Sequence, residues 1–136
     1  ERYAKAMEAK EFFMLFYNSK CPHVAIENPV PMSCIGLPPY DQIIQPYEYG
    51  EPFSKKTCLW LKNLPLLQPT EVVEPDIVHA GKRNSGFSGA MWHAVDENGK
   101  IIPWNDPRTA KARSRTFHGI AKAFAQQWAG DIRDKE

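Results

Sequence analysis

The feature that most constrains this chain is an apolar run that ends in two prolines, residues 24–31 (VAIENPVP). Its first residues are typical of a buried strand, whereas Pro29 and Pro31 cannot continue a helix or the interior of a sheet. Glu27 and Asn28 are therefore expected where regular structure has to stop. Parallel α/β sheets bind ligands just beyond the carboxyl ends of their strands, so the pattern predicts a ligand-binding carboxylate. The plainer alternative is a buried strand followed by a proline-rich turn.

The elements around this run predict the fold class. Residues 3–17 carry aromatic and methionine side chains at helical spacing, interleaved with lysines and glutamates, so we expect an amphipathic helix. Its last turn is almost wholly apolar, which predicts burial on two sides. Pro22 and the turn formers before it separate this helix from a strand at 23–27. Helix, short loop and strand are half of a βαβ unit, so the pattern favours an α/β fold completed by an earlier strand.

The remainder of the chain divides at its prolines. Short strands are expected at 42–45 and 55–61, the first ended by Pro46 and the second by Asn63 and Pro65. A weak hairpin is possible between 92–95 and 100–102. The last helix should run from a cap at Ser114 or Thr116 to Gly130, with Ile120, Phe124 and Trp128 four residues apart. We treat 1–136 as a single or partial domain, with helix and core strands at 1–64, an irregular substrate-facing part at 65–107, and a basic segment plus helix at 108–130.

Composition limits the function and the location. A length of 136 residues with 43% hydrophobic and 24% charged residues is typical of one folded domain. The net charge of +1 predicts no strong overall attraction to nucleic acid, so any contact with DNA must come from local clusters. Three cysteines without CxxC spacing indicate reduced thiols in a cytoplasmic protein, and the histidines and cysteines predict no metal site. The longest apolar run, Phe12 to Tyr17, is too short for a membrane span.

Two basic groups can be interpreted in two ways. The residues between Arg108 and Arg115 are the densest positive cluster and precede a predicted helix start, which suits contact with phosphate; a solvated face is the alternative. Lys55 and Lys56 open a predicted strand, where charged residues often protect a sheet edge. The chain begins with Glu1 and no methionine, as expected of a processed protein or of the tail of a longer polypeptide.

Taken in order, five segments resemble the C-terminal half of phage and prophage proteins related to cytosine-5 DNA methyltransferases. They are residues 25–29 (AIENP), 41–46 (DQIIQP), 55–61 (KKTCLWL), 113–117 (RSRTF) and 119–123 (GIAKA). The resemblance spans residues 1 to about 130. The order and the residue sequences of the five segments together are more specific to that family than any single segment. It implies an S-adenosylmethionine-dependent methyltransferase-like, Rossmann-like mixed sheet, with one strand antiparallel.

The resemblance also assigns roles to residues. In that family the glutamate at the strand end holds the flipped cytosine through its ring nitrogen and amino group, which gives Glu27 the catalytic role. A protonated carboxyl that donates to the ring nitrogen withdraws electrons and eases attack by a thiolate on the adjacent carbon. By the same resemblance the DNA-binding and base-binding residues are Asn28, Pro29, Lys55, Lys56, Arg113 and Arg115, and the residues near S-adenosylmethionine are Thr116, Phe117 and Gly119.

Two parts of the family's pattern are absent from these 136 residues. There is no glycine-bearing turn after a first strand to hold the cofactor, and no Pro-Cys at a strand end to supply the nucleophile. We therefore expect the chain to lack the N-terminal, cofactor-binding half and to need it, from the same polypeptide or a companion chain, for catalysis. Two alternatives stay open: a non-catalytic DNA- or protein-binding module that uses residues 108–115, and a pyrimidine nucleotide-modifying enzyme of related fold.

Overall fold

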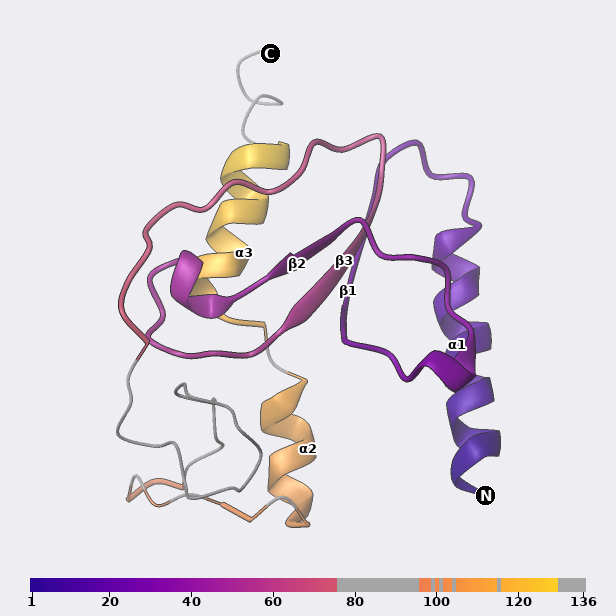
Figure 1. The fold of residues 1–136 in the computed structure, drawn as a ribbon, viewed down its shortest axis with the longest axis horizontal. Helices are drawn as coiled ribbons and strands as arrows, with labels where there is room; N and C mark the ends of the chain where they lie inside the picture. Colours follow the sequence, from indigo (N-terminus) through magenta and orange to yellow (C-terminus); the bar gives the residue numbers. More distant parts are fainter. Residues whose placement is uncertain (76–95, 99, 101, 104, 115, 130–136) are drawn as a thin grey trace. The chain divides into compact units, whose positions relative to one another are not determined.

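The computed structural model describes residues 1–75, 96–98, 100, 102–103, 105–114 and 116–129, with only the backbone for Ala112 and Arg113. The chain forms two compact units (Figure 1). Unit 1 contains Glu1–Ile44 and Lys56–Leu67, and unit 2 contains Gln45–Lys55 and the described part of Gln68–Glu136. Helices and strands are both present, so the fold is mixed α and β, as expected.

Unit 1 is built on a three-stranded sheet whose order is β1-β3-β2. The strands are β1 (Val24–Pro29), β2 (Gln42–Ile44) and β3 (Thr57–Lys62), and both outer strands pair with β3 in the antiparallel sense. The three predicted strands are thus confirmed, each within a few residues. Within the described residues the sheet is small and antiparallel, because β3 runs against both of its neighbours.

Helix α1 (Arg2–Tyr17) lies beside the sheet in Figure 1 and confirms the predicted N-terminal helix. Phe13 is its one buried residue, and its ring meets the ring of Trp60 edge to face with centroids 4.9 Å apart. Cys58 completes this core cluster, with Met14, Ile26 and Leu37 packed against it. Because strand residues alternate between faces, Cys58 and Trp60 belong to the face of β3 that α1 covers, and Leu59 belongs to the other face.

The predicted burial of α1 on two sides is not seen. Phe12, Leu15 and Phe16 are 64%, 71% and 50% exposed, respectively. On a helical wheel Phe12 and Leu15 lie about 100° and 160° from Phe13, and Phe16 lies about 60° from it, so the C-terminal half of α1 is apolar around most of its circumference.

Polar side chains hold the connections of unit 1 in place. Asp41, just before β2, donates its backbone N–H to Leu59 O (2.8 Å) and accepts the Leu61 N–H with its carboxylate (2.7 Å). Gln42 binds both backbone groups of Leu67: its side-chain nitrogen donates to Leu67 O at 2.7 Å, and its oxygen accepts Leu67 N–H at 2.9 Å. The loop of residues 30–41, expected to be irregular, contains one 3-10 turn, η1 (Ser33–Ile35).

Unit 2 has less regular structure. Its elements are the 3-10 turn η2 (Pro46–Glu48), the helices α2 (Pro107–Arg113) and α3 (His118–Phe124), and the π-helical turn η4 (Ala125–Ala129). Gln45 and Glu48 form a capping box at η2, and the Gln45 side chain also accepts Lys55 N–H at 2.9 Å. Gln127 makes a two-way pair with the backbone of Gln68, both bonds 2.8 Å long.

The predicted last helix is present but is shorter and differently capped. It begins at His118 with Phe117 in the cap position and no side-chain cap bond, so the expected cap from Ser114 or Thr116 is wrong. Ser114 Oγ donates instead to Lys111 O at 2.7 Å. Ile120 is buried as expected, and the rings of Phe124 and Trp128 stack at 4.8 Å. Gly130 and residues 92–95 of the expected hairpin lie outside the described residues.

The described helices could cross a bilayer only if one of them had about 20 predominantly apolar residues. None of them is long and apolar enough to do so.

Candidate functional site

Glu27 lies inside strand β1 and not at its end. The strand continues through Asn28 and Pro29, which face Cys58 and Thr57 of β3, so the expectation that regular structure stops at Glu27 is wrong. Pro29 is tolerated because β1 is an outer strand and Pro29 is its last residue. Glu27 faces Leu59 across the ladder, which places its half-buried side chain on the sheet face opposite α1.

The strand register brings two of the resembling segments together. Pro29 pairs with Thr57, so Lys56 follows at the end of the sheet where β1 ends. Glu27, Asn28, Pro29 and Lys56 are therefore neighbours at one end of unit 1, although about thirty residues of sequence separate them. Asn28 is half-buried and lies on the α1 face, and Lys56 is exposed.

The three cysteines do not supply the nucleophile that the resemblance requires. Cys58 is fully buried, and this burial raises the pKa of its thiol, which disfavours the thiolate. Its side chain belongs to the α1 face, on the other side of the sheet from Glu27. Cys21 and Cys34 are exposed; Cys21 precedes a proline before β1, and Cys34 sits in η1.

A second group of candidate residues meets in unit 2. The Lys55 ammonium lies 5.7 Å from the centroid of the Phe117 ring, a cation–π contact, and the Phe53 ring lies 5.9 Å from the same ring. The structure thus brings Lys55 and Phe117 together, with Thr116 exposed beside them. Phe53 was missed because it precedes the predicted strand and no periodic pattern includes it.

Gly119 has a packing role that the sequence did not reveal. A Cβ atom at this position would overlap the backbone carbonyl oxygen of Tyr49. Tyr49 is only 3% exposed, and its hydroxyl is buried without a hydrogen-bond partner among the described residues. Burial, and secondarily the nearby Glu48 carboxylate, raises the pKa of Tyr49 to about 12. The close approach of α3 to the turn at Tyr49 requires a glycine here.

The basic segment forms a helix of its own, α2, ahead of α3. Arg108 pairs with Asp106 through two side-chain bonds, the shorter one 3.0 Å long. These bonds lower the pKa of Asp106 and raise that of Arg108, so this guanidinium already has an anionic partner. Lys111 is exposed. The side chain of Arg113, and Arg115 altogether, lie outside what the structure describes.

The candidate residues therefore fall into two groups, one in each unit. Glu27, Asn28, Pro29 and Lys56 belong to unit 1, while Lys55, Arg113, Thr116, Phe117 and Gly119 belong to unit 2. No family model, curated protein or solved structure matches the chain. The first group offers a half-buried carboxylate on a fixed strand and an exposed cation near the same end of the sheet. The second group offers aromatic and cationic side chains.

Proposed function

We propose that this chain is the base-holding part of a DNA cytosine-5 methyltransferase-like protein, with Glu27 as the carboxyl group that binds the target cytosine. The observation that carries the proposal is the register of β1 and β3. It joins the Glu-Asn-Pro segment to the Lys-Lys-Thr-Cys segment at one end of a sheet, and these are two of the segments on which the resemblance depends. The Asp41 and Gln42 contacts show that a third segment, 41–46, holds the same sheet together.

Glu27 suits this role chemically. A carboxyl group can donate one hydrogen bond to the ring nitrogen of cytosine and accept another from its exocyclic amino group. Donation to the ring nitrogen draws electron density from the conjugated C5–C6 double bond and eases addition of a thiolate at C6, which leaves the electron pair at C5 to accept the methyl group. Pairing of β1 with β3 fixes the backbone of Glu27, so the carboxyl group is positioned before the base arrives. The base must leave the duplex to reach it.

The cofactor needs residues beyond those in the described structure. S-adenosylmethionine would supply the methyl group. However, Gly119 is closely packed against Tyr49, and the Phe117 ring already contacts Phe53 and Lys55. Thr116, Phe117 and Gly119 alone therefore do not form a cofactor pocket, and we expect titration calorimetry with this chain to show no binding.

The proposal includes a Rossmann-like sheet in the complete protein, to which the three described strands would contribute. Their antiparallel order does not itself indicate such a sheet, so this part depends on the resemblance. DNA is the proposed partner. Lys56 on unit 1 and Lys111 on unit 2 are exposed cations suited to phosphate contact.

The test uses the encoded polypeptide at its natural length, labelled S-adenosylmethionine and cytosine-containing duplex DNA. We expect Glu27→Gln to reduce methyl transfer by about 100-fold or more, as loss of a general acid does, while its circular dichroism is unchanged. Glu11→Gln, an exposed carboxylate on α1, is the matched control and should transfer at the wild-type rate.

Three results would contradict the proposal. Equal activity of Glu27→Gln and wild type would remove Glu27 from the reaction. Methylation of free cytidine monophosphate but not of DNA would favour the nucleotide-modifying alternative. DNA binding without any transfer would favour the non-catalytic module, and that binding should then weaken when the arginines of residues 108–115 become alanine.

A further inference from the structure

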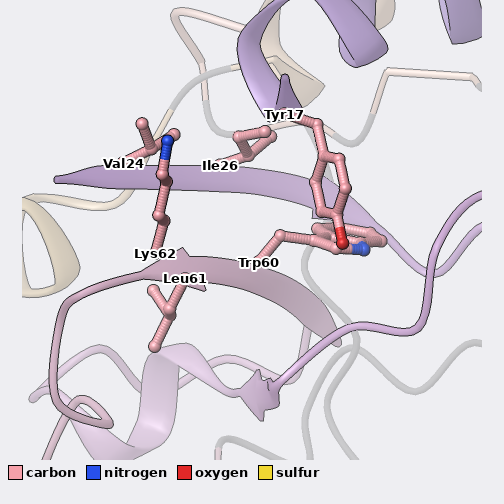
Figure 2. Close-up of a pocket in the computed structure, with 6 residues that line it drawn as sticks. All are labelled: Tyr17, Val24, Ile26, Trp60, Leu61 and Lys62. Atoms are coloured by element: carbon pink, nitrogen blue, oxygen red, sulfur yellow. The ribbon is translucent and has the colours of Figure 1, made fainter. Parts of the chain in front are cut away.

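A small cavity opens at the end of the sheet that lies away from Lys56. Figure 2 shows its lining: Tyr17 from the end of α1, Val24 and Ile26 from β1, and Trp60, Leu61 and Lys62 from β3. The cavity holds about 220 Å³. Val24 pairs with Lys62 and Ile26 with Trp60, so these four side chains form the floor on the α1 face.

The floor of this cavity is fixed before any ligand arrives. The Trp60 indole nitrogen donates to Pro38 O at 2.8 Å, and its ring is held edge-on by both Phe13 and Tyr40. Lys62 donates to Ser19 O at 2.8 Å, which ties β3 to the loop after α1. An ammonium group has three N–H bonds, so this contact leaves Lys62 able to bind an anion at the rim. Because the Trp60 ring is already held in one position, it loses little conformational entropy when a ligand binds.

The size of the cavity limits what it can hold. Pockets for drug-sized ligands and cofactors usually enclose about 300–1,000 Å³, which is more than this cavity offers. A volume of 220 Å³ suits one large apolar side chain, the usual anchor of a protein–peptide contact. Such an anchor would bury its apolar surface against Tyr17, Val24 and Ile26.

The side of α1 that faces away from the sheet is also apolar. Phe12, Leu15 and Phe16 sit on the last turns of α1, from which Tyr17 reaches into the cavity, and all three are at least half exposed. Together they expose roughly 300 Å² of apolar surface, given what large side chains typically present. Contiguous apolar patches of this size on a single chain are often interaction sites.

The side chains that line the cavity include the basic Lys62 and no carboxylate. Residues 12–26 and 57–70, which supply all of its walls, contain no Asp or Glu, whereas Lys20 and Lys62 fall within them. The Asp41 carboxylate is on the far, β2 side of β3, where it accepts Leu61 N–H, and Glu27 is on the opposite sheet face. An occupant with negative charge beside its apolar anchor is therefore complementary to this rim.

From these observations we propose that the cavity forms a docking site for an acidic peptide segment of another protein. One bulky apolar side chain of the segment enters the cavity, and a flanking carboxylate lies beside Lys62. This site is separate from the residues of the proposed function and does not depend on it. A nucleic-acid strand fits less well, because it brings phosphates but no apolar side chain for the cavity.

The test is an NMR titration of the ¹⁵N-labelled chain with four hexapeptides. Three consist of acidic residues around a central Trp, Leu or Ala, and the fourth has Lys in place of every acid around Trp. We expect the acidic Trp and Leu peptides to shift the amide signals of Tyr17, Val24, Ile26 and Lys62 with Kd values of about 1 mM or tighter. The Ala peptide and the basic peptide should bind at least about tenfold more weakly.

Two variants and a control localise the binding. Lys62→Glu reverses the rim charge and Val24→Phe fills the cavity, and each should weaken the acidic Trp peptide by about fivefold or more. Lys5→Glu makes the same charge change on the remote first turns of α1 and should leave the affinity unchanged. The thermal unfolding midpoint of each variant shows whether unit 1 is intact.

Any of four results would overturn the proposal. The first is that no acidic peptide causes a shift at several millimolar, and the second is that the basic peptide binds equally well. The third is that the shifts are confined to residues outside the cavity. The fourth is that a cytosine oligonucleotide perturbs the cavity residues when the acidic peptides do not. Concentration-dependent shifts of Phe12, Leu15 and Phe16 without peptide, with a doubled mass in sedimentation, would assign the face to a second copy of the chain.

Discussion

Different interactions stabilise unit 1 and unit 2 internally. In unit 1 a continuous ladder joins three strands, and Trp60, Phe13 and Cys58 form a core on one sheet face. In unit 2 the elements are short, and much of the order comes from side chains that bind backbone groups, such as Gln45 and Gln127. The stability that a strand ladder and a hydrophobic core provide falls gradually as side-chain volume is removed. A single side-chain-to-backbone hydrogen bond, in contrast, is lost entirely when its side chain is replaced. The two units should therefore respond to mutation in different ways.

The largest expected effect is in unit 1. Trp60→Ala removes the side chain that contacts Phe13 and Tyr40 and leaves a cavity, which should lower the free energy of unfolding by about 4 kcal/mol. Trp60→Phe keeps most of the volume and loses the bond to Pro38, so it should cost about half as much. Urea unfolding followed by circular dichroism measures both values. Equal losses for the two variants would show that the bond to Pro38, and not the volume, sets the stability.

A somewhat smaller effect is expected at Gly119 in unit 2. In Gly119→Ala the new methyl group would overlap the Tyr49 carbonyl, so α3 must shift, at a cost of about 2–3 kcal/mol. Lys122→Ala, an exposed change on the same helix, is the control and should be nearly neutral. Hydrogen exchange of the amides of α3 gives the local readout. Unchanged protection in Gly119→Ala would mean that the turn at Tyr49 and α3 are not tightly packed.

The smallest effect at neutral pH is expected at Tyr49. Its hydroxyl is buried without a described partner, so Tyr49→Phe should be as stable as wild type or slightly more stable near pH 8. The pKa of Tyr49 is raised from 10.0 to about 12, so the unfolded chain loses this proton first as the pH rises. Wild type should therefore lose stability relative to Tyr49→Phe between about pH 10 and 12. Parallel stability curves for the two proteins over this range would indicate that Tyr49 ionises equally in both states.

The sequence predicted most elements of unit 1 and few details of unit 2. Local periodicity was sufficient for α1 and the three strands, because apolar spacing and prolines mark them directly. It could not give the antiparallel order, since pairing joins Val24 to Lys62 across a long loop. In unit 2 the position of α3 depends on Gly119 meeting a carbonyl seventy residues earlier, a contact that has no local signal.

Some features of the candidate site were also predictable from the sequence, and others were not. Glu27 was singled out correctly as a strand residue, but its position within the ladder and the face it occupies follow from the pairing with Leu59. Lys55 and Phe117 were chosen separately, and only the fold shows that they meet. The involvement of Phe53 and the packing role of Gly119 were not predictable from residue type or spacing.

Asp41 also affects how the protein behaves at high concentration. Strand β2 is only three residues long, so β3 extends beyond it and could offer bare backbone amides to another molecule. The Asp41 carboxylate accepts the Leu61 N–H at this place and adds a negative charge beside it. Charges on sheet edges are a common protection against edge-to-edge aggregation. This single side chain should thus help to keep the chain monodisperse at the concentrations that spectroscopy requires.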